Sequence, residues 1–247
     1  MISKFKIRLV FLLASILFII GSSIIFDSSS SIGKVVFGLD ASTSPLTIQN
    51  AMWLFFFLGI AELFYRYRVS QQDVEALSHS YLVEEMGVFY NTELLTNVMK
   101  EVHDKDDRLA KLILALFMRY QASHKSTDET HQMLNSQLEM MQFKIDIDYN
   151  LVRYISWLIP TLGFVGTVVG ISEALSYAGQ PGVSEMPSFL SELTSVLAVA
   201  FNTTLVALIM SAVIVYGIHL TQGREEAVIQ HCGEYCLNHF INKLMTQ

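Results

Sequence analysis

The chain has 247 residues, of which 52% are hydrophobic and only 16% are charged, and its mean hydropathy is +0.42. Soluble domains carry about 25% charged residues, so this composition argues against a soluble globular protein. The apolar residues are gathered into long runs, which is typical of membrane-spanning segments. The formal net charge of −7 is therefore less informative than the positions of the Lys and Arg residues along the chain.

Four apolar segments are long enough to cross a bilayer, at about residues 9–26, 48–65, 154–177 and 189–220. About 20 helical residues span the hydrocarbon layer, and lipid offers no partners to an open backbone. We therefore expect an all-α, polytopic membrane protein with four transmembrane helices and long cytoplasmic helical extensions. The first segment also has the basic start and apolar core of a cleavable signal peptide, although its run of about 18 residues is long for one.

The basic residues predict the orientation of these segments. Lys and Arg flank all four segments on what would be one side of the membrane: Lys4, Lys6, Arg8, Arg66, Arg68, Arg153 and Arg224. The loops at 27–47 and 178–187 contain only Lys34. Cytoplasmic loops carry an excess of Lys and Arg, so we expect both termini and the region between the second and third segments to be cytoplasmic.

The polar region between the second and third segments reads as helical, because its apolar residues recur at steps of three and four. We expect helices at about 70–100, 105–122 and 126–153, the last running straight into the third segment. The C-terminal residues predict another helix continuing from the fourth segment. The expected divisions are 1–66 (first transmembrane pair with its outside loop), 67–152 (cytoplasmic helical region), 153–221 (pore-lining transmembrane pair) and 222–247 (C-terminal cytoplasmic helix).

The third apolar segment carries a stripe of small residues in the stretch "IPTLGFVGTVVGISEAL", residues 159–175. Gly163, Gly166, Thr167 and Gly170 are spaced at i, i+3, i+4 and i+7, which places them on one helix face. Glycine weakens helices in water, but small residues let two backbones approach closely inside a membrane. This face is therefore expected to pack tightly against a neighbouring helix.

The fourth apolar segment has a matching face. Ala200, Thr204, Ala207 and Ser211 are spaced at i, i+4, i+7 and i+11, and Thr203 stands beside them. Two faces that each hold a threonine could line a narrow ion path in mid-membrane. The same stripes could equally serve helix packing alone, since a membrane threonine often bonds back to a carbonyl one turn earlier. Spacing leaves both interpretations open.

Several other polar groups have ordinary explanations beside functional ones. Glu62 lies one turn before Arg66, so we expect a local ion pair. Glu173 and Glu192 would either attract cations to an outer mouth or lie solvated at the headgroup level.

Two further groups lie in the polar regions. The run "HDKDDR" (103–108) would contact a cytoplasmic partner or simply begin a helix, with Asp104 or Asp106 as its N-cap. Cys232, Cys236 and His239 share a helix face, but their spacing matches no established zinc pattern. We expect no metal site. We also expect no enzyme activity, because the chain has no nucleotide-binding glycine loop or nucleophile motif.

Together the two small-residue stretches point to a family. "IPTLGFVGTVVGISEAL" and "AVAFNTTLVALIMSAVIVY" (198–216), in that order across a short loop, resemble the glycine-rich helix and its partner helix in the MotA/TolQ/ExbB proton-channel family. The resemblance covers about residues 150–220. Four expected spans are closer to MotA, whereas "LGFVGTVVG" is more similar to TolQ and ExbB.

The resemblance implies a homo-oligomer, expected to be a pentamer, in the bacterial inner membrane. It would surround a dimer of a single-span ExbD/TolR/MotB-like protein that carries a membrane aspartate. Thr167 and Thr204 match the positions that face this aspartate and the ion path, and Thr203 is the next candidate. The helix-packing residues would be Gly163, Gly166, Gly170, Ala200, Ala207 (where the family often has glycine) and Ser211.

The expected function is therefore a channel-forming stator subunit of an ion-driven membrane motor, which couples ion flow to motion of the single-span partner. No cofactor is expected, and the transported ion is a proton or sodium. Sodium stays a candidate because several hydroxyl oxygens could coordinate it, those of Thr161, Thr194, Ser195 and Thr203. The alternative is a non-conducting structural helical membrane scaffold. The process that the motor would power does not follow from the sequence.

Overall fold

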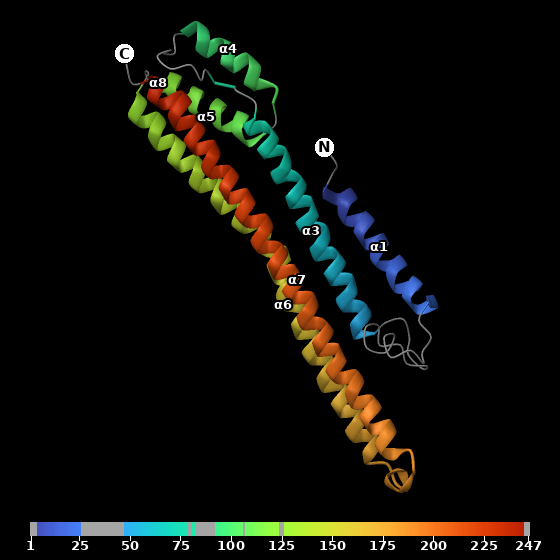
Figure 1. The fold of residues 1–247 in the computed structure, drawn as a ribbon. Helices are drawn as coiled ribbons and strands as arrows, with labels where there is room; N and C mark the ends of the chain where they lie inside the picture. Colours follow the sequence, from blue (N-terminus) through green and yellow to red (C-terminus); the bar gives the residue numbers. More distant parts are fainter. Residues whose placement is uncertain are drawn as a thin grey trace. The chain divides into compact units, whose positions relative to one another are not determined.

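The computed structural model describes residues 4–25, 47–78, 81–82, 92–105, 107–123 and 126–244. Helix makes up 92% of these residues and none of them lies in a strand, so the chain is all-α. The elements in chain order are α1 (Lys4–Ile25), α3 (Ile48–Leu77), α4 (Thr92–His103), α5 (Arg108–Ala122), α6 (Thr127–Ala178), the 3-10 turn η1 (Val183–Glu185), α7 (Phe189–Cys236), the π-helical turn η2 (Leu237–Ile241) and α8 (Asn242–Leu244) (Figure 1).

Three of the described helices are long and apolar enough to cross a membrane. They are Ile48–Leu77, Thr127–Ala178 and Phe189–Leu244. The first expected segment forms α1, a helix of 22 residues, but α1 is not among these three. A fourth span and the cytoplasmic position of the polar helices remain predictions.

The chain divides into two compact units, and the longest helices contribute to both. Unit 1 comprises Met1–Tyr65 and Asn150–His219. Unit 2 comprises Arg66–Tyr149 and Leu220–Gln247. The outside loop expected at 27–47 falls outside the described residues, except for Thr47.

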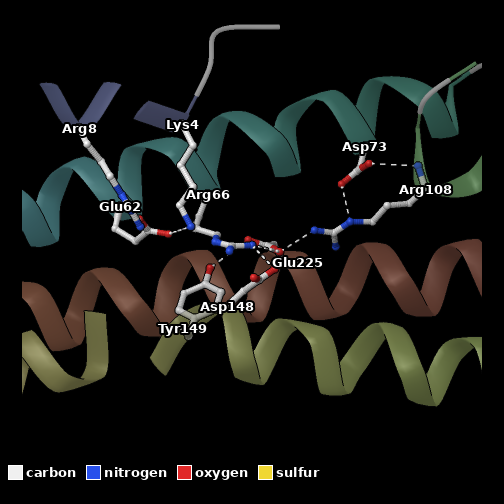
Figure 2. A network of polar contacts seen from close by, with 9 residues as sticks. All are labelled: Lys4, Arg8, Glu62, Arg66, Asp73, Arg108, Asp148, Tyr149 and Glu225. Atoms are coloured by element: carbon white, nitrogen blue, oxygen red, sulfur yellow. Dashed lines mark hydrogen bonds and ion pairs between the residues drawn. The ribbon is translucent and has the colours of Figure 1, made fainter. Parts of the chain in front are cut away.

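In unit 1, α1 packs on α3 through rings and ion pairs. Phe18 stacks at an angle against Trp53 and Phe57, with ring centroids 4.9 and 5.4 Å apart. Glu62 of α3 is fully buried, and α1 supplies two cations to it (Figure 2): Lys4 Nζ and Arg8 Nη2 each lie 2.7 Å from its carboxylate. The sequence predicted a local partner for Glu62 on α3, because spacing along one helix gives no information about cations on another helix.

Unit 2 has its own apolar core. It gathers side chains from α4, α5 and the last turns of α7, together with Tyr81 and Leu82. α5 is amphipathic, and it buries one face through Leu112, Leu116 and Phe117. Cys232 and Cys236 are free thiols within this core, which explains their spacing by packing.

The cap of α5 differs from the expectation. Asp107 is the N-cap residue, and its side chain accepts from the backbone N–H of Ala110 at 2.7 Å. The sequence predicts Asp104 or Asp106 as this N-cap. Asp104 instead lies in a turn, and Asp106 falls outside the described residues. The acidic run contains three candidates within four residues, and only the position at which the helix begins selects one of them.

The helix expected at 70–100 is wrong as a single element. α3 continues from the second apolar segment and ends at Leu77, and Tyr81 and Leu82 are not helical. Side-chain contacts hold these two residues: the hydroxyl of Tyr81 donates to Asp107 at 3.0 Å, and the N–H of Leu82 donates to the Tyr235 hydroxyl at 3.0 Å. Residues 83–91 fall outside the described part of the chain. The other expected helices are confirmed, including the unbroken α6 and the C-terminal continuation of α7.

Candidate functional site

The glycines of α6 face the small residues of α7. A Cβ atom placed on Gly170 would lie 2.6 Å from the Cβ of Ala200, and one placed on Gly163 would overlap the Cβ of Ala207. Real side chains do not approach that closely, so the two backbones are nearer than any larger residue permits. Close backbone contact of this kind is what small residues allow between membrane helices.

Two threonine hydroxyls meet inside this tight contact. The Oγ1 atoms of Thr167 on α6 and Thr204 on α7 are hydrogen-bonded to each other. Thr167 Oγ1 also lies 3.2 Å from the carbonyl oxygens of Gly163 and Ala200, and Thr204 Oγ1 lies 3.2 Å from that of Gly163. The result is a cluster of four oxygen atoms, two hydroxyl and two carbonyl. Both threonines are half-buried.

This oxygen cluster can bond to either protonation state of an acid. A threonine hydroxyl donates one hydrogen bond and accepts two, so it can serve a carboxylate as donor or a carboxylic acid as acceptor. Hydroxyl and carbonyl oxygens are also the ligands that hard cations prefer. The apolar parts of these helices, residues 154–172 and 193–220, contain no Asp or Glu. The cluster therefore has no carboxylate proton carrier of its own in these segments.

Thr203, the third candidate, has different partners. Its hydroxyl donates to the carbonyl of Val199 at 2.9 Å and accepts from Gln49 Nε2 of α3, also at 2.9 Å. Its methyl group fills the space opposite Gly166, where an added Cβ would lie 2.6 Å away. Thr203 is therefore engaged by α3 as well as by α6, although it directly precedes Thr204.

Sequence reasoning missed Gln49. The sequence signal for Gln49 was an amide side chain at the start of an apolar segment. In the structure this side chain is only 5% exposed. Its bond to Thr203 also shows where the hydroxyl pair lies along α3. The pair stands beside the first turn of α3, whereas a Cβ placed on Gly59, in the middle of the apolar part of α3, would lie against Ile155 and Ile214.

Pro160 lies within α6, which continues through it. Proline has no N–H, so the carbonyl of Ser156, four residues earlier, loses its partner within the helix. The hydroxyl of Ser211 on α7 donates to this carbonyl at 2.8 Å. Ser211 thus contributes a specific hydrogen bond as well as a small side chain.

The other polar candidates lie apart from this cluster. Glu173 and Glu192 are exposed, and Glu192 accepts a hydrogen bond from Tyr177. The hydroxyls of Thr161 and Thr194 bond back to carbonyls of their own helices, those of Trp157 and Leu190, at 2.9 and 2.8 Å.

The described residues hold no group of three or more His, Cys, Asp or Glu side chains that could bind a metal ion.

Unit 2 contains a network of charged side chains that the sequence did not predict (Figure 2). Glu225 is fully buried, and it accepts from Arg108 Nη2 at 2.8 Å and from the Tyr149 hydroxyl at 3.2 Å. Arg66, only 4% exposed, lies 2.9 Å from Asp148 and 3.9 Å from Glu225. The partners come from four helices and are far apart in the chain, so spacing carries no signal for them.

The chain matches the model of a known protein family. The model of the MotA/TolQ/ExbB proton channel family matches residues 99–233, which is more than half of the chain. The match includes both small-residue faces, the two threonines and, of the residues named in the network around Glu225, every one except Arg66. The chain belongs to this family of membrane proton channels, which is not a family of enzymes.

No match to the chain was found among curated proteins or among solved structures.

Proposed function

We propose that this chain is the channel-forming stator subunit of an ion-driven membrane motor. The observation that carries the proposal is the paired hydroxyls of Thr167 and Thr204, which lie with the carbonyl oxygens of Gly163 and Ala200 between two apolar helices. Membership of a proton channel family supports it. The cluster offers oxygen atoms to a moving ion, but the apolar segments around it contain no carboxylic acid that could carry a proton.

The missing acid would come from a partner. Family members generally form complexes with single-span proteins of the ExbD/TolR/MotB type, and a membrane aspartate on such a span would face the hydroxyl pair. A charge inside the bilayer is costly, by as much as about 2.5–3.5 kcal/mol at the centre on insertion scales. Hydroxyls that bond to both states of the acid would reduce this cost. One charge crossing 100 mV releases about 2.3 kcal/mol, which is available for motion.

Motion would follow from a mismatch of symmetry. Five copies of this chain around two partner helices cannot present the same surroundings to both aspartates. Alternate protonation would then favour relative rotation, a rigid-body switch between subunits. The chain would sit in the bacterial inner membrane with four spans, with both termini and unit 2 in the cytoplasm. The transported ion would be a proton, with sodium as the other candidate.

The test replaces Thr167 and Thr204 together by Val, which keeps the shape and removes both hydroxyls. Ion flux is measured in inverted membrane vesicles with a pH-sensitive dye, in sodium-free and in sodium-containing buffer. Co-purification reports assembly with the partner, and native mass spectrometry counts the subunits. We expect assembled complexes with at least a tenfold lower flux, and near-normal flux when both positions carry Ser. Ser172→Ala, which removes an exposed hydroxyl from α6, is the matched control.

A non-conducting scaffold is the second candidate, and one observation favours it. The hydroxyls of Thr167 and Thr204 already bond to each other and to backbone carbonyls, so they need no ion to satisfy them. A scaffold predicts full activity in the double Val variant as long as the helices still pack. Wild-type flux in assembled double-Val complexes would overturn the channel proposal.

A further inference from the structure

The start of α3 is the third element at the hydroxyl cluster. Thr47 caps this helix, since its hydroxyl accepts from the N–H of Asn50 at 3.1 Å. An N-cap of this kind fixes the residue at which a helix begins. Gln49 follows in the first turn, and Ile48 beside it lies 3.6 Å from where a Cβ of Gly166 would be. The first turn of α3 is therefore placed against α6 and α7 together.

Gln49 makes a directed contact with α7. Its amide is buried away from water, where a polar group needs a hydrogen-bond partner, and the partner is the hydroxyl of Thr203 at 2.9 Å. The Thr203 proton points to the carbonyl of Val199. One donor and one acceptor of this hydroxyl are thus used, which leaves little capacity to follow a moving ion.

Thr203 and Thr204 are consecutive residues of one helix, so the rotation of α7 about its axis fixes the directions of both side chains together. If α7 turned about its axis, Thr203 would leave Gln49 and Thr204 would leave Thr167. We infer that Gln49 is a positioning residue: by holding Thr203 it sets the rotation of α7 that keeps the Thr204 hydroxyl against Thr167. This assigns Thr203 to positioning and leaves the ion path to Thr167 and Thr204. The inference rests on the proposed function.

The test uses variants that separate hydrogen bonding from packing. Thr203→Val keeps the shape that fills the space opposite Gly166 but removes the hydroxyl, whereas Thr203→Ser keeps the hydroxyl and removes the methyl group. Gln49→Met keeps the length of the side chain without the amide. Gln142→Met, at an exposed glutamine of α6, is the matched control. Ion flux per assembled complex is measured for each variant in the same vesicles.

We expect Gln49→Met and Thr203→Val each to lower flux about threefold to tenfold. The double variant should be no worse than either one, because both remove the same bond. Thr203→Ser should rescue flux to near the wild-type level. A residue that serves packing alone would give the reverse order, with Val tolerated and Ser impaired.

Besides that reverse order, two results overturn the inference. One is wild-type flux in assembled Gln49→Met complexes. The other is an additive loss in the double variant. Both are distinct from failure of the proposed function, which appears as normal flux in the Thr167→Val/Thr204→Val variant. If that variant is inactive and Gln49→Met is normal, the channel proposal stands and the role of Gln49 falls.

Discussion

The hydroxyl of Ser211 on α7 donates a 2.8 Å hydrogen bond to the carbonyl oxygen of Ser156 on α6. This is the carbonyl that Pro160 deprives of its partner in the helix. Proline is tolerated in membrane helices where a neighbouring group satisfies the freed carbonyl. The Ser211 hydroxyl thus supplies the hydrogen bond that Pro160 removes from α6, and it links the two helices at this level.

We predict that Ser211→Ala lowers the free energy of unfolding by about 1–3 kcal/mol, because the Ser156 carbonyl is left without a donor. The measurement is thermal unfolding of the purified protein in detergent, followed by circular dichroism. In a Pro160→Ala background the restored N–H supplies the donor, so the effect of Ser211→Ala should shrink by at least half. An equal loss in both backgrounds would contradict this account. Ser172→Ala should change little.

Gly163→Ala and Gly223→Ala should have opposite effects on stability. A Cβ on Gly163 would overlap Ala207, whereas one on Gly223 would meet no atom within 4 Å. Overpacking costs about 1–3 kcal/mol, and replacing an unhindered helical glycine by alanine gains about 0.5–1 kcal/mol. Detergent melting curves compare the two. Ala207→Gly should restore part of the loss in Gly163→Ala, and two changes of the same sign would contradict the close contact.

Glu225→Gln should destabilise the protein far more than Glu226→Gln. Glu225 is fully buried and bonds to Arg108 and Tyr149, and loss of its charge weakens hydrogen bonds worth about 1.5–3 kcal/mol each. Glu226 is exposed and accepts a hydrogen bond from Gln222 on the helix surface, so its change should stay within about 0.5 kcal/mol. Melting temperatures of the two variants give the comparison. Similar values for both would show that the network contributes little.

Stability should fall at high pH through Tyr81. Burial, followed by the hydrogen bond to Asp107, raises the pKa of Tyr81 to about 12, whereas an unfolded tyrosine titrates at about 10. The neutral phenol is favoured in the folded state, so its contribution is complete below pH 10 and is lost as the pH rises from 10 through 12. Chemical unfolding at several pH values should show this loss. Tyr81→Phe should reduce the slope only in part, because burial also raises the pKa of Tyr120. An unchanged slope in that variant would exclude Tyr81 as a source.

Helical periodicity carried much of the prediction. Spacing at i, i+3, i+4 and i+7 placed Gly163, Gly166 and Gly170 on one face, and these glycines do meet α7. The same reasoning predicted that α6 runs unbroken from the polar region into the apolar one. It was wrong for 70–100, because a run of helix-forming residues shows no break at Leu77. The break is held by contacts from Tyr81 and Leu82 to distant parts of the chain.

Partners across helices did not follow from periodicity. For Glu62 the sequence predicted an ion pair within its own helix, whereas the structure shows two cations supplied by α1. Gln49 was passed over because an amide at the start of an apolar segment looks like an ordinary helix end. Its bond with Thr203 spans 154 positions of the chain.

By itself, the sequence determined that this chain is helical, that it has long apolar segments and that small residues and threonines share faces of two of them. These properties depend on composition and on a period of 3.6 residues, which are local. The tertiary structure alone decided which carbonyl oxygens lie against the Thr167 and Thr204 hydroxyls. It also decided which hydroxyl bonds to the carbonyl that Pro160 frees, and which charged side chains meet at Glu225. Those contacts depend on the register and rotation of one helix against another, because a shift of one residue turns a helix by about 100° and faces each side chain elsewhere.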